Sequence, residues 1–179
     1  LIADGIPATM PDGQGQAATF NLGSARRIEV LRGPFSALYG NSSGGVIQVF
    51  TEDGPPQPTI TPSLVLGSYD TSRGGIKFGG QRGQLNYLVD LSRFETDGYR
   101  DHSAATRDQF NSKLGYALDQ DSVLTLIVNG LSQPNTEDPL GLTKAQALAD
   151  PRQVDPAALT FNTRKSIEHK QGGVVYERR

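Results

Sequence analysis

The chain has 179 residues, a formal net charge of −2 and a hydrophobic share of 36%. A charge this close to zero gives no electrostatic basis for a nucleic-acid partner, and we expect none. The absence of cysteine excludes disulfides and thiol chemistry, and no run of about 18 apolar residues is present that could form a membrane-spanning helix.

The first 54 residues predict a small mixed α/β unit. Residues 28–31 (Ile-Glu-Val-Leu) form a short strand candidate. Pro34 suits the first position of a short helix over residues 35–39, because its missing N–H would have no partner there. Gly40 is a favourable residue directly after that helix.

A second strand follows within the same unit. Gly44 and Gly45 permit a tight bend before the alternating segment 46–51. Three of the four residues 55–58 are prolines, which predicts a stiff linker and the domain boundary.

From about residue 59 apolar and polar side chains alternate, as a half-buried sheet requires. The clearest apolar stripes are Leu85, Tyr87, Val89, Leu91 and, further on, Phe110, Leu114, Tyr116, Leu118. We predict about six strands, over residues 59–67, 72–80, 84–95, 106–118, 121–131 and 165–177. Ten tilted strand residues span roughly 23 Å, which matches the apolar belt of an outer-membrane barrel.

The predicted connections alternate in length. Residues 79–83 and 119–121 are short turns, whereas 96–105 and 132–164 are long loops. Bacterial outer-membrane barrels have this asymmetry, with the long loops outside. The hairpin at residues 67–71 is shorter than the pattern requires.

The segment 132–164 is too long for a simple connection. It contains a predicted helix over Lys144–Ala149, with Thr143 as its N-cap and Pro151 ending it. Two interpretations stay open: a solvated insertion, or a loop that contacts or gates a ligand.

No residues form a catalytic or metal-binding pattern. His102 and His169 are far apart in sequence, and the acidic residues near His102 indicate a solvated loop. The sequence shows no combination of nucleophile, base and orienting group at suitable spacings. We therefore expect no enzymatic activity, no bound metal and no cofactor.

The chain begins without methionine in the middle of a pattern and stops inside a strand-like segment, so we expect a piece of a longer protein. Residues 25–40 closely resemble the late plug signature of TonB-dependent receptors, and the resemblance continues through residue 51. Upstream, residues 2–7 resemble the "DG-hydrophobic-P" strand of that family. Downstream, Asp97–Arg100 resembles its early barrel loop.

The resemblance implies a plugged transmembrane antiparallel β-barrel, of which this chain holds a small α/β plug part followed by up-and-down strands. Residues 1–54 would be the C-terminal part of the plug, 55–58 the Pro-rich linker, and 59–179 the N-terminal part of the barrel. Family members have about 22 strands around a lumen that the plug fills.

The resemblance also implies active uptake of a scarce solute across the bacterial outer membrane, most often a ferric siderophore. Its implied partners are the TonB-ExbB-ExbD complex, acting through an N-terminal segment missing here, a small-molecule or metal-chelate substrate, and outer-membrane lipid. Alternatives are a passive channel or signalling receptor with the same fold, and a soluble β-rich binding module, which would bury the apolar faces in a shared core.

The resemblance assigns roles to three groups of residues. Conformational plug-motif positions are Gly33, Pro34, Tyr39, Gly40, Gly44 and Gly45. Plug–barrel contacts are expected at Arg26, Arg27, Glu29 and Arg32, with ordinary surface charge as the alternative. A ligand-facing plug apex would include Met10, Asp12, Gln14 and Gln16, with a flexible loop as the alternative.

Overall fold

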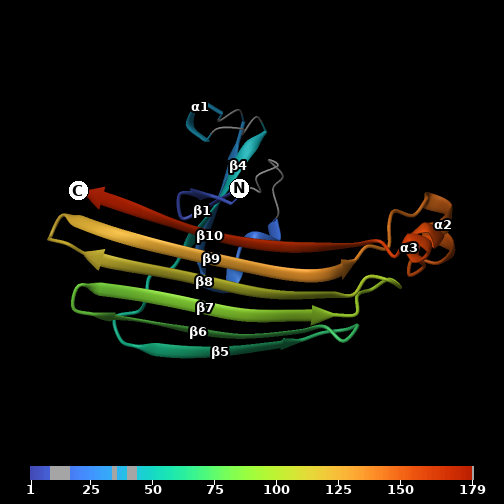
Figure 1. Cartoon of the computed structure of the whole chain (residues 1–179), viewed down its shortest axis with the longest axis horizontal. Helices are drawn as coiled ribbons and strands as arrows, with labels where there is room; N and C mark the ends of the chain where they lie inside the picture. Colours follow the sequence, from blue (N-terminus) through green and yellow to red (C-terminus); the bar gives the residue numbers. More distant parts are fainter. Residues whose placement is uncertain (9–16, 34–35, 40–43, 179) are drawn as a thin grey trace.

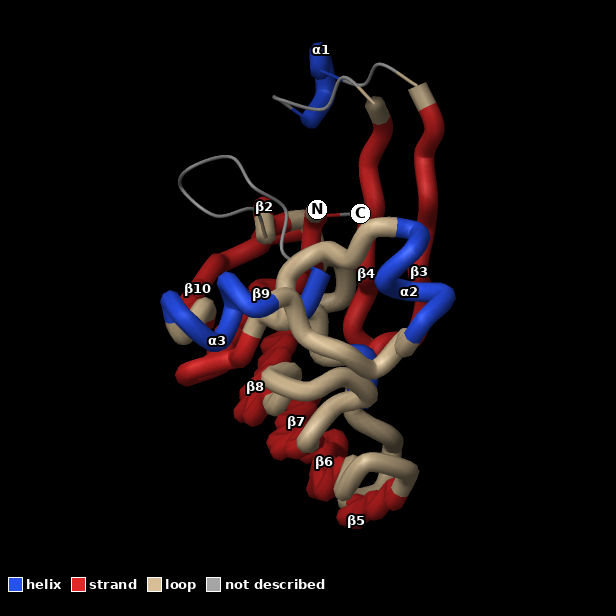
Figure 2. The backbone as a smooth tube through the Cα atoms, turned by 90° about the vertical axis from the view of Figure 1, so that its right-hand side faces the viewer, coloured by secondary structure: helices blue, strands red, loops and turns tan. Residues whose placement is uncertain are grey.

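The computed structural model describes residues 1–8, 17–33, 36–39 and 44–178. Its described strands form two sheets, a four-stranded sheet of order β2-β1-β4-β3 and a six-stranded sheet of order β10-β9-β8-β7-β6-β5. The strands of the small sheet run across those of the large sheet (Figures 1 and 2). No helix in the described part of the chain is both long and apolar enough to cross a membrane.

The small sheet belongs to the predicted α/β unit. Its elements are β1 (Ile2–Ala3), β2 (Ile6–Pro7), β3 (Ala25–Arg32) and β4 (Gly45–Thr51), with α1 (Ser36–Tyr39) between β3 and β4 and the short 3-10 turns η1 (Ala17–Thr19) and η2 (Leu22–Ser24) before β3. Both predicted strands and the predicted helix are confirmed. Val46 and Val49 of β4, with Ile2 of β1, form its small buried core.

Asp4 fastens the β1–β2 turn to the end of β4. Asp4 has φ +47°, which suits the tight turn with Gly5. Its carboxylate accepts two hydrogen bonds from Thr51, at 2.7 Å from the backbone N–H and 2.6 Å from the hydroxyl. Because β1 pairs in parallel with β4 at only two positions, these bonds supply much of its attachment.

The large sheet is antiparallel throughout and each strand pairs with its neighbour in sequence. The six predicted strands are confirmed as β5 (Thr59–Leu66), β6 (Ser72–Arg82), β7 (Leu85–Thr96), β8 (Ala105–Ala117), β9 (Ser122–Glu137) and β10 (Arg164–Arg178). The short 67–71 hairpin and the long loops lie at one end of the sheet, where Figure 1 also shows α2 and α3.

Strand β9 is longer than the sequence predicts, ending at Glu137 instead of residue 131. Pro134 lacks a backbone N–H, which disfavours it inside a paired strand. The structure accommodates it beside a register shift between Lys165 and Ile167 of β10, where an unpaired position costs no ladder bond.

The large sheet exposes its apolar face and buries its polar face, which is the reverse of the arrangement in a soluble protein. Leu91 and Leu126 on the apolar face are 43% and 40% exposed, whereas Asp90 and Asn111 on the polar face are each 5% exposed. The small sheet and its turns cover that polar face. An apolar exterior and a polar interior are expected of a membrane barrel wall, and they contradict a shared soluble core.

Replacing Leu126 with arginine tests the apolar exterior. A cation there would face hydrocarbon, so we expect the intact protein to lose about 2 kcal/mol of unfolding free energy. Urea unfolding of the intact protein in lipid bilayers measures the loss. Leu148→Arg is the control, because Leu148 is 77% exposed on a loop helix. Equal unfolding midpoints for the two variants would place Leu126 outside the membrane.

Candidate functional site

Polar side chains of the six-stranded sheet, here called the wall, bind the predicted α/β unit of residues 1–54, here called the plug unit. We call this set of contacts the plug–wall interface. The Gln109 amide donates to the carbonyls of Ala18 and Phe20 at 2.8 and 3.0 Å. The Asn111 amide donates to the hydroxyls of Ser24 and Thr51 at 2.6 and 3.1 Å. Two neighbouring inward positions of β8 therefore bind η1, η2 and β4 together.

Strand β7 adds a buried contact to the same interface. Asp90 accepts a hydrogen bond of 2.6 Å from the Asn21 amide. The Asn21 side-chain oxygen in turn accepts from the Gly23 N–H at 3.0 Å and caps η2. A Cβ at Gly23 would come within 2.9 Å of the Asp90 carboxylate, so any larger residue there would require that carboxylate to shift.

Two lysines of the wall pair with the acidic end of the plug unit. Lys77 of β6 forms an ion pair with Glu52 and donates to the carbonyl of Gly23 at 3.1 Å. Lys113 of β8 lies 2.8 Å from the Asp53 carboxylate and donates to the Thr51 carbonyl at 3.2 Å. The lysine side chains are 26% and 22% exposed, so solvent screens these pairs only in part.

The chain leaves the plug unit at a fixed anchor. The Asn86 side chain donates to the Gly54 carbonyl and accepts from the Gly54 N–H, both at 2.8 Å. A Cβ at Gly54 would lie 2.1 Å from the Tyr87 carbonyl oxygen and 2.6 Å from that of Gly80. Gly54, the residue directly before the linker, therefore lies in direct backbone contact with β6 and β7.

An apolar contact completes the interface. Ile6 of β2 packs against Gly173 of β10, where a Cβ would meet the Ile6 Cδ1 at 2.1 Å. Most of the contacts named above, within the described residues, are side-chain hydrogen bonds and ion pairs. Such contacts exchange readily with water, so the plug unit is held in place without being fused to the wall.

Three of the four residues expected at plug–barrel contacts have other described partners. Arg27 pairs with Glu29 at 3.0 Å and lies over the Phe50 ring at 4.3 Å. Arg26 lies 3.8 Å from Asp53, the carboxylate that Lys113 also binds. Arg32 is exposed at the end of β3. Their contact with further barrel wall stays a prediction.

The plug-motif residues fall partly within the described structure. Gly33 and Gly45 have φ of +119° and +144°, a backbone conformation that favours glycine. Gly44 precedes β4, and Tyr39 ends α1. Pro34 and Gly40 lie outside the described residues, as do all four plug-apex positions, Met10, Asp12, Gln14 and Gln16.

The long loop after β9 is an ordered element with two helices. The predicted helix α2 spans Lys144–Ala149, and Thr143 caps it in a reciprocal pair with Gln146, which confirms the prediction. A second helix, α3 (Pro156–Phe161), was not predicted; Asp155 caps it and Pro156 opens it. The start signal was present in the sequence, but the helix is too short to show an apolar period.

Arg100 and His102 fasten this loop to the preceding one. The Arg100 guanidinium donates to the carbonyls of Gln153, Leu140 and Pro139 at 2.9, 2.6 and 3.0 Å. His102 lies 2.9 Å from the carbonyl of Thr163 and 3.5 Å from the Glu137 carboxylate. The two loops therefore behave as one unit at the end of the wall.

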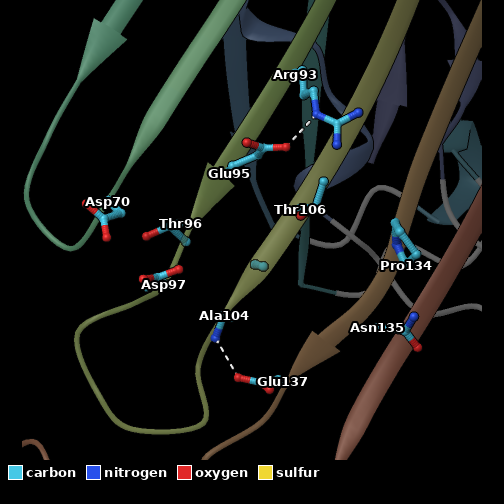
Figure 3. A pocket seen from close by; sticks show the side chains of 11 residues that line it. Asp70, Arg93, Glu95, Thr96, Asp97, Ala104, Thr106, Pro134, Asn135 and Glu137 are labelled. Atoms are coloured by element: carbon cyan, nitrogen blue, oxygen red, sulfur yellow. Dashed lines mark hydrogen bonds and ion pairs between the residues drawn. The ribbon is translucent and has the colours of Figure 1, made fainter.

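A pocket of about 540 Å³ lies beside this loop unit (Figure 3). Its charged side chains are largely paired: Arg93 with Glu95 at 2.6 Å, and Glu137 with the Ala104 N–H at 3.0 Å. Within the described residues no three His, Asp or Glu side chains gather closely enough to hold a metal ion. The described lining of the pocket therefore shows no metal-binding cluster.

Sequence reasoning missed the residues that hold the plug. It identified the inward face of the strands as polar but gave no role to Lys77, Asp90, Gln109, Asn111 or Lys113. Their alternation with apolar residues was the available signal. Which of them meet the plug depends on the register between strands, which the sequence does not show.

Comparisons with known proteins identify the plug unit. Residues 1–46 match the family model of the TonB-dependent receptor plug domain. The metal-pseudopaline receptor CntO of Pseudomonas aeruginosa is 28% identical over 102 residues, which cover 55% of this chain and 14% of that receptor. CntO of a second strain matches equally. The chain thus spans about a seventh of the length of these curated relatives.

Solved structures share the fold of the whole chain. The unliganded ferric citrate transporter FecA has a TM-score of 0.77 at 24% identity, covering 99% of this chain and 28% of its own. The siderophore receptor PirA of Acinetobacter baumannii has a TM-score of 0.68 at 19% identity, covering 99% and 29%. The ferripyoverdine receptor of the P. aeruginosa outer membrane has 0.61 at 20% identity, covering 73% and 18%.

The fold and the plug match define a class, the plugged β-barrels of the outer membrane. Within that class the chain resembles TonB-dependent receptors, with the end of a plug followed by barrel strands, as its sequence predicts. Its homologues are outer-membrane receptors and transporters, not enzymes, which confirms the predicted location.

Proposed function

We propose that this chain is the plug end and first wall of a receptor that takes up a metal chelate by TonB-dependent active transport. A ferric siderophore is the substrate class we favour. The plug–wall interface carries the proposal: Asp90, Gln109, Asn111 and two lysines hold the plug unit by contacts that water can replace.

Transport through a filled lumen requires a plug that stays closed at rest and moves on demand. Polar contacts meet both needs, because breaking them exposes groups that water then solvates. The exposed apolar outer face counts against a soluble binding module, and the seated plug unit counts against a passive pore. The named relatives, which bind ferripyoverdine or metal-pseudopaline or transport ferric citrate, support a metal chelate as substrate.

The proposed partners follow from this mechanism. TonB, energised by ExbB and ExbD, would pull on an N-terminal segment of the receptor, and outer-membrane lipid would surround the apolar face. The ligand would reach Met10, Asp12, Gln14 and Gln16 at the plug apex. The clamped loops between β7 and β8 and between β9 and β10 would border its entry.

Uptake by the intact receptor tests the proposal. Cells carrying it with the N-terminal TonB-contacting segment deleted should bind a labelled ferric siderophore at the surface but fail to accumulate it. The undeleted receptor in a strain without TonB is the matched control and should behave identically. Accumulation that persists in both strains would contradict active transport and indicate passive passage.

A further inference from the structure

Three side chains form a row on the lumen face, one step from the plug–wall interface toward the long loops. In the strand register Arg73 of β6 is opposite Phe94 of β7, and Phe94 is opposite Arg107 of β8. Arg107 lies two residues from Gln109, which binds the plug unit, so both project to the same side. The row therefore faces the lumen between the plug unit and the loops.

The two arginines of this row differ from three nearby cations of the wall. Lys77, Lys113 and Arg93 each pair with a carboxylate. Among the described residues neither Arg73 nor Arg107 does. The Arg107 Nε is buried without a hydrogen-bond partner, a state that costs free energy until an acceptor arrives.

Phe94 contacts one arginine of the row, and the other arginine lines a cavity. The Arg107 guanidinium lies 5.1 Å from the centre of the Phe94 ring, which restricts its orientation. Arg73 lines an adjoining cavity of about 240 Å³, together with Ser63, Ser92, Lys77 and Asp90. Lys77 is paired with Glu52 and Asp90 with Asn21, so Arg73 supplies the unmatched charge among these lining residues.

We propose that the Arg73–Phe94–Arg107 row binds an anionic ligand that carries at least two carboxylates. A guanidinium matches a carboxylate with two parallel hydrogen bonds, and the ring offers a flat apolar surface between the two cations. The outer strands of the row are about 10 Å apart, which favours a multidentate chelate over a single small anion. This assignment rests on the proposed uptake function and narrows its substrate to chelates of negative charge.

Surface binding by the full-length receptor tests the row without requiring transport. The cells lack TonB, and the probes are radiolabelled ferric citrate, which is anionic, and a neutral ferric trihydroxamate chelate. R73A/R107A should bind ferric citrate about tenfold or more weakly, since charge-assisted hydrogen bonds are lost. R73K/R107K should retain part of the affinity. Arg82→Ala, on the same strand β6 but exposed near a short turn, should change nothing.

Unchanged ferric citrate affinity in R73A/R107A, at equal receptor amounts, would overturn the assignment. Equal weakening for both probes would also overturn it, because that indicates a structural role. A receptor that binds only the neutral chelate contradicts the anionic site while leaving the uptake proposal intact. If the parent receptor binds neither probe, the result counts against both the anionic site and the proposed uptake of metal chelates. Accumulation of a chelate in cells that lack TonB would contradict the uptake proposal alone.

Discussion

Replacing Gly54 with valine is expected to prevent assembly of the receptor. The Gly54 backbone contacts β6 and β7 so closely that even a Cβ would lie 2.1 Å from the Tyr87 carbonyl oxygen. Each neighbouring atom belongs to backbone in a paired strand, so none can move aside without breaking the ladder. The two Asn86 hydrogen bonds would be lost as well.

The measurement is the amount of heat-modifiable, folded receptor in the outer-membrane fraction. Gly54→Val should lower it to near background, whereas Gly141→Val should not, because nothing lies within 4 Å of a Cβ at Gly141. Gly54→Ala should also lower the yield strongly, since its Cβ alone meets the same backbone atoms. Full yield from Gly54→Val would show that residue 54 does not lie against β6 and β7.

The double substitution K77M/K113M is expected to loosen the plug without unfolding the wall. Methionine keeps the aliphatic length of lysine but leaves Glu52 and Asp53 without their partners on the wall. The two pairs together contribute about 2–4 kcal/mol, after allowing for the partial exposure of Asp53. The resting plug should therefore sample displaced positions more often.

Planar-bilayer conductance of the full receptor measures this effect. The double variant should show frequent openings and admit large antibiotics into cells, while the parent stays closed. Lys144→Met, on an exposed position of α2, controls for loss of positive charge. A closed baseline in K77M/K113M, at normal folded yield, would mean that the neutral contacts of Asn21, Gln109 and Asn111 hold the plug alone.

Strand positions and types were predictable because each strand carries its own alternating pattern. The pattern places Leu85 and Leu91 on one face and Asp90 on the other, and the structure has them so. Helix α2 was equally predictable from the sequence, because its capping box lies within four consecutive residues. These features depend on neighbours in sequence.

The residues that hold the plug depend on long-range register instead. Asn111 meets Ser24 and Thr51 across separations of 87 and 60 residues. The resemblance assigned barrel contacts to residues 26–32, and in the structure Arg27 and Glu29 of this stretch pair with each other on one strand. Lys77 and Lys113 are isolated in sequence and become partners of Glu52 and Asp53 only after the sheets pack.

The unequal attachment of the small sheet fixes the order in which it yields to mechanical load. A pull from the N-terminal side reaches β1 first, and the turn after this two-residue strand is fastened by the bonds between Asp4 and Thr51. Thr51 also accepts from Asn111 on the wall, so rupture at Asp4 would leave Thr51 tethered. Strand β1 would then detach first while Gly54 stays anchored to the wall. An opening would therefore form on the β1 side of the plug unit.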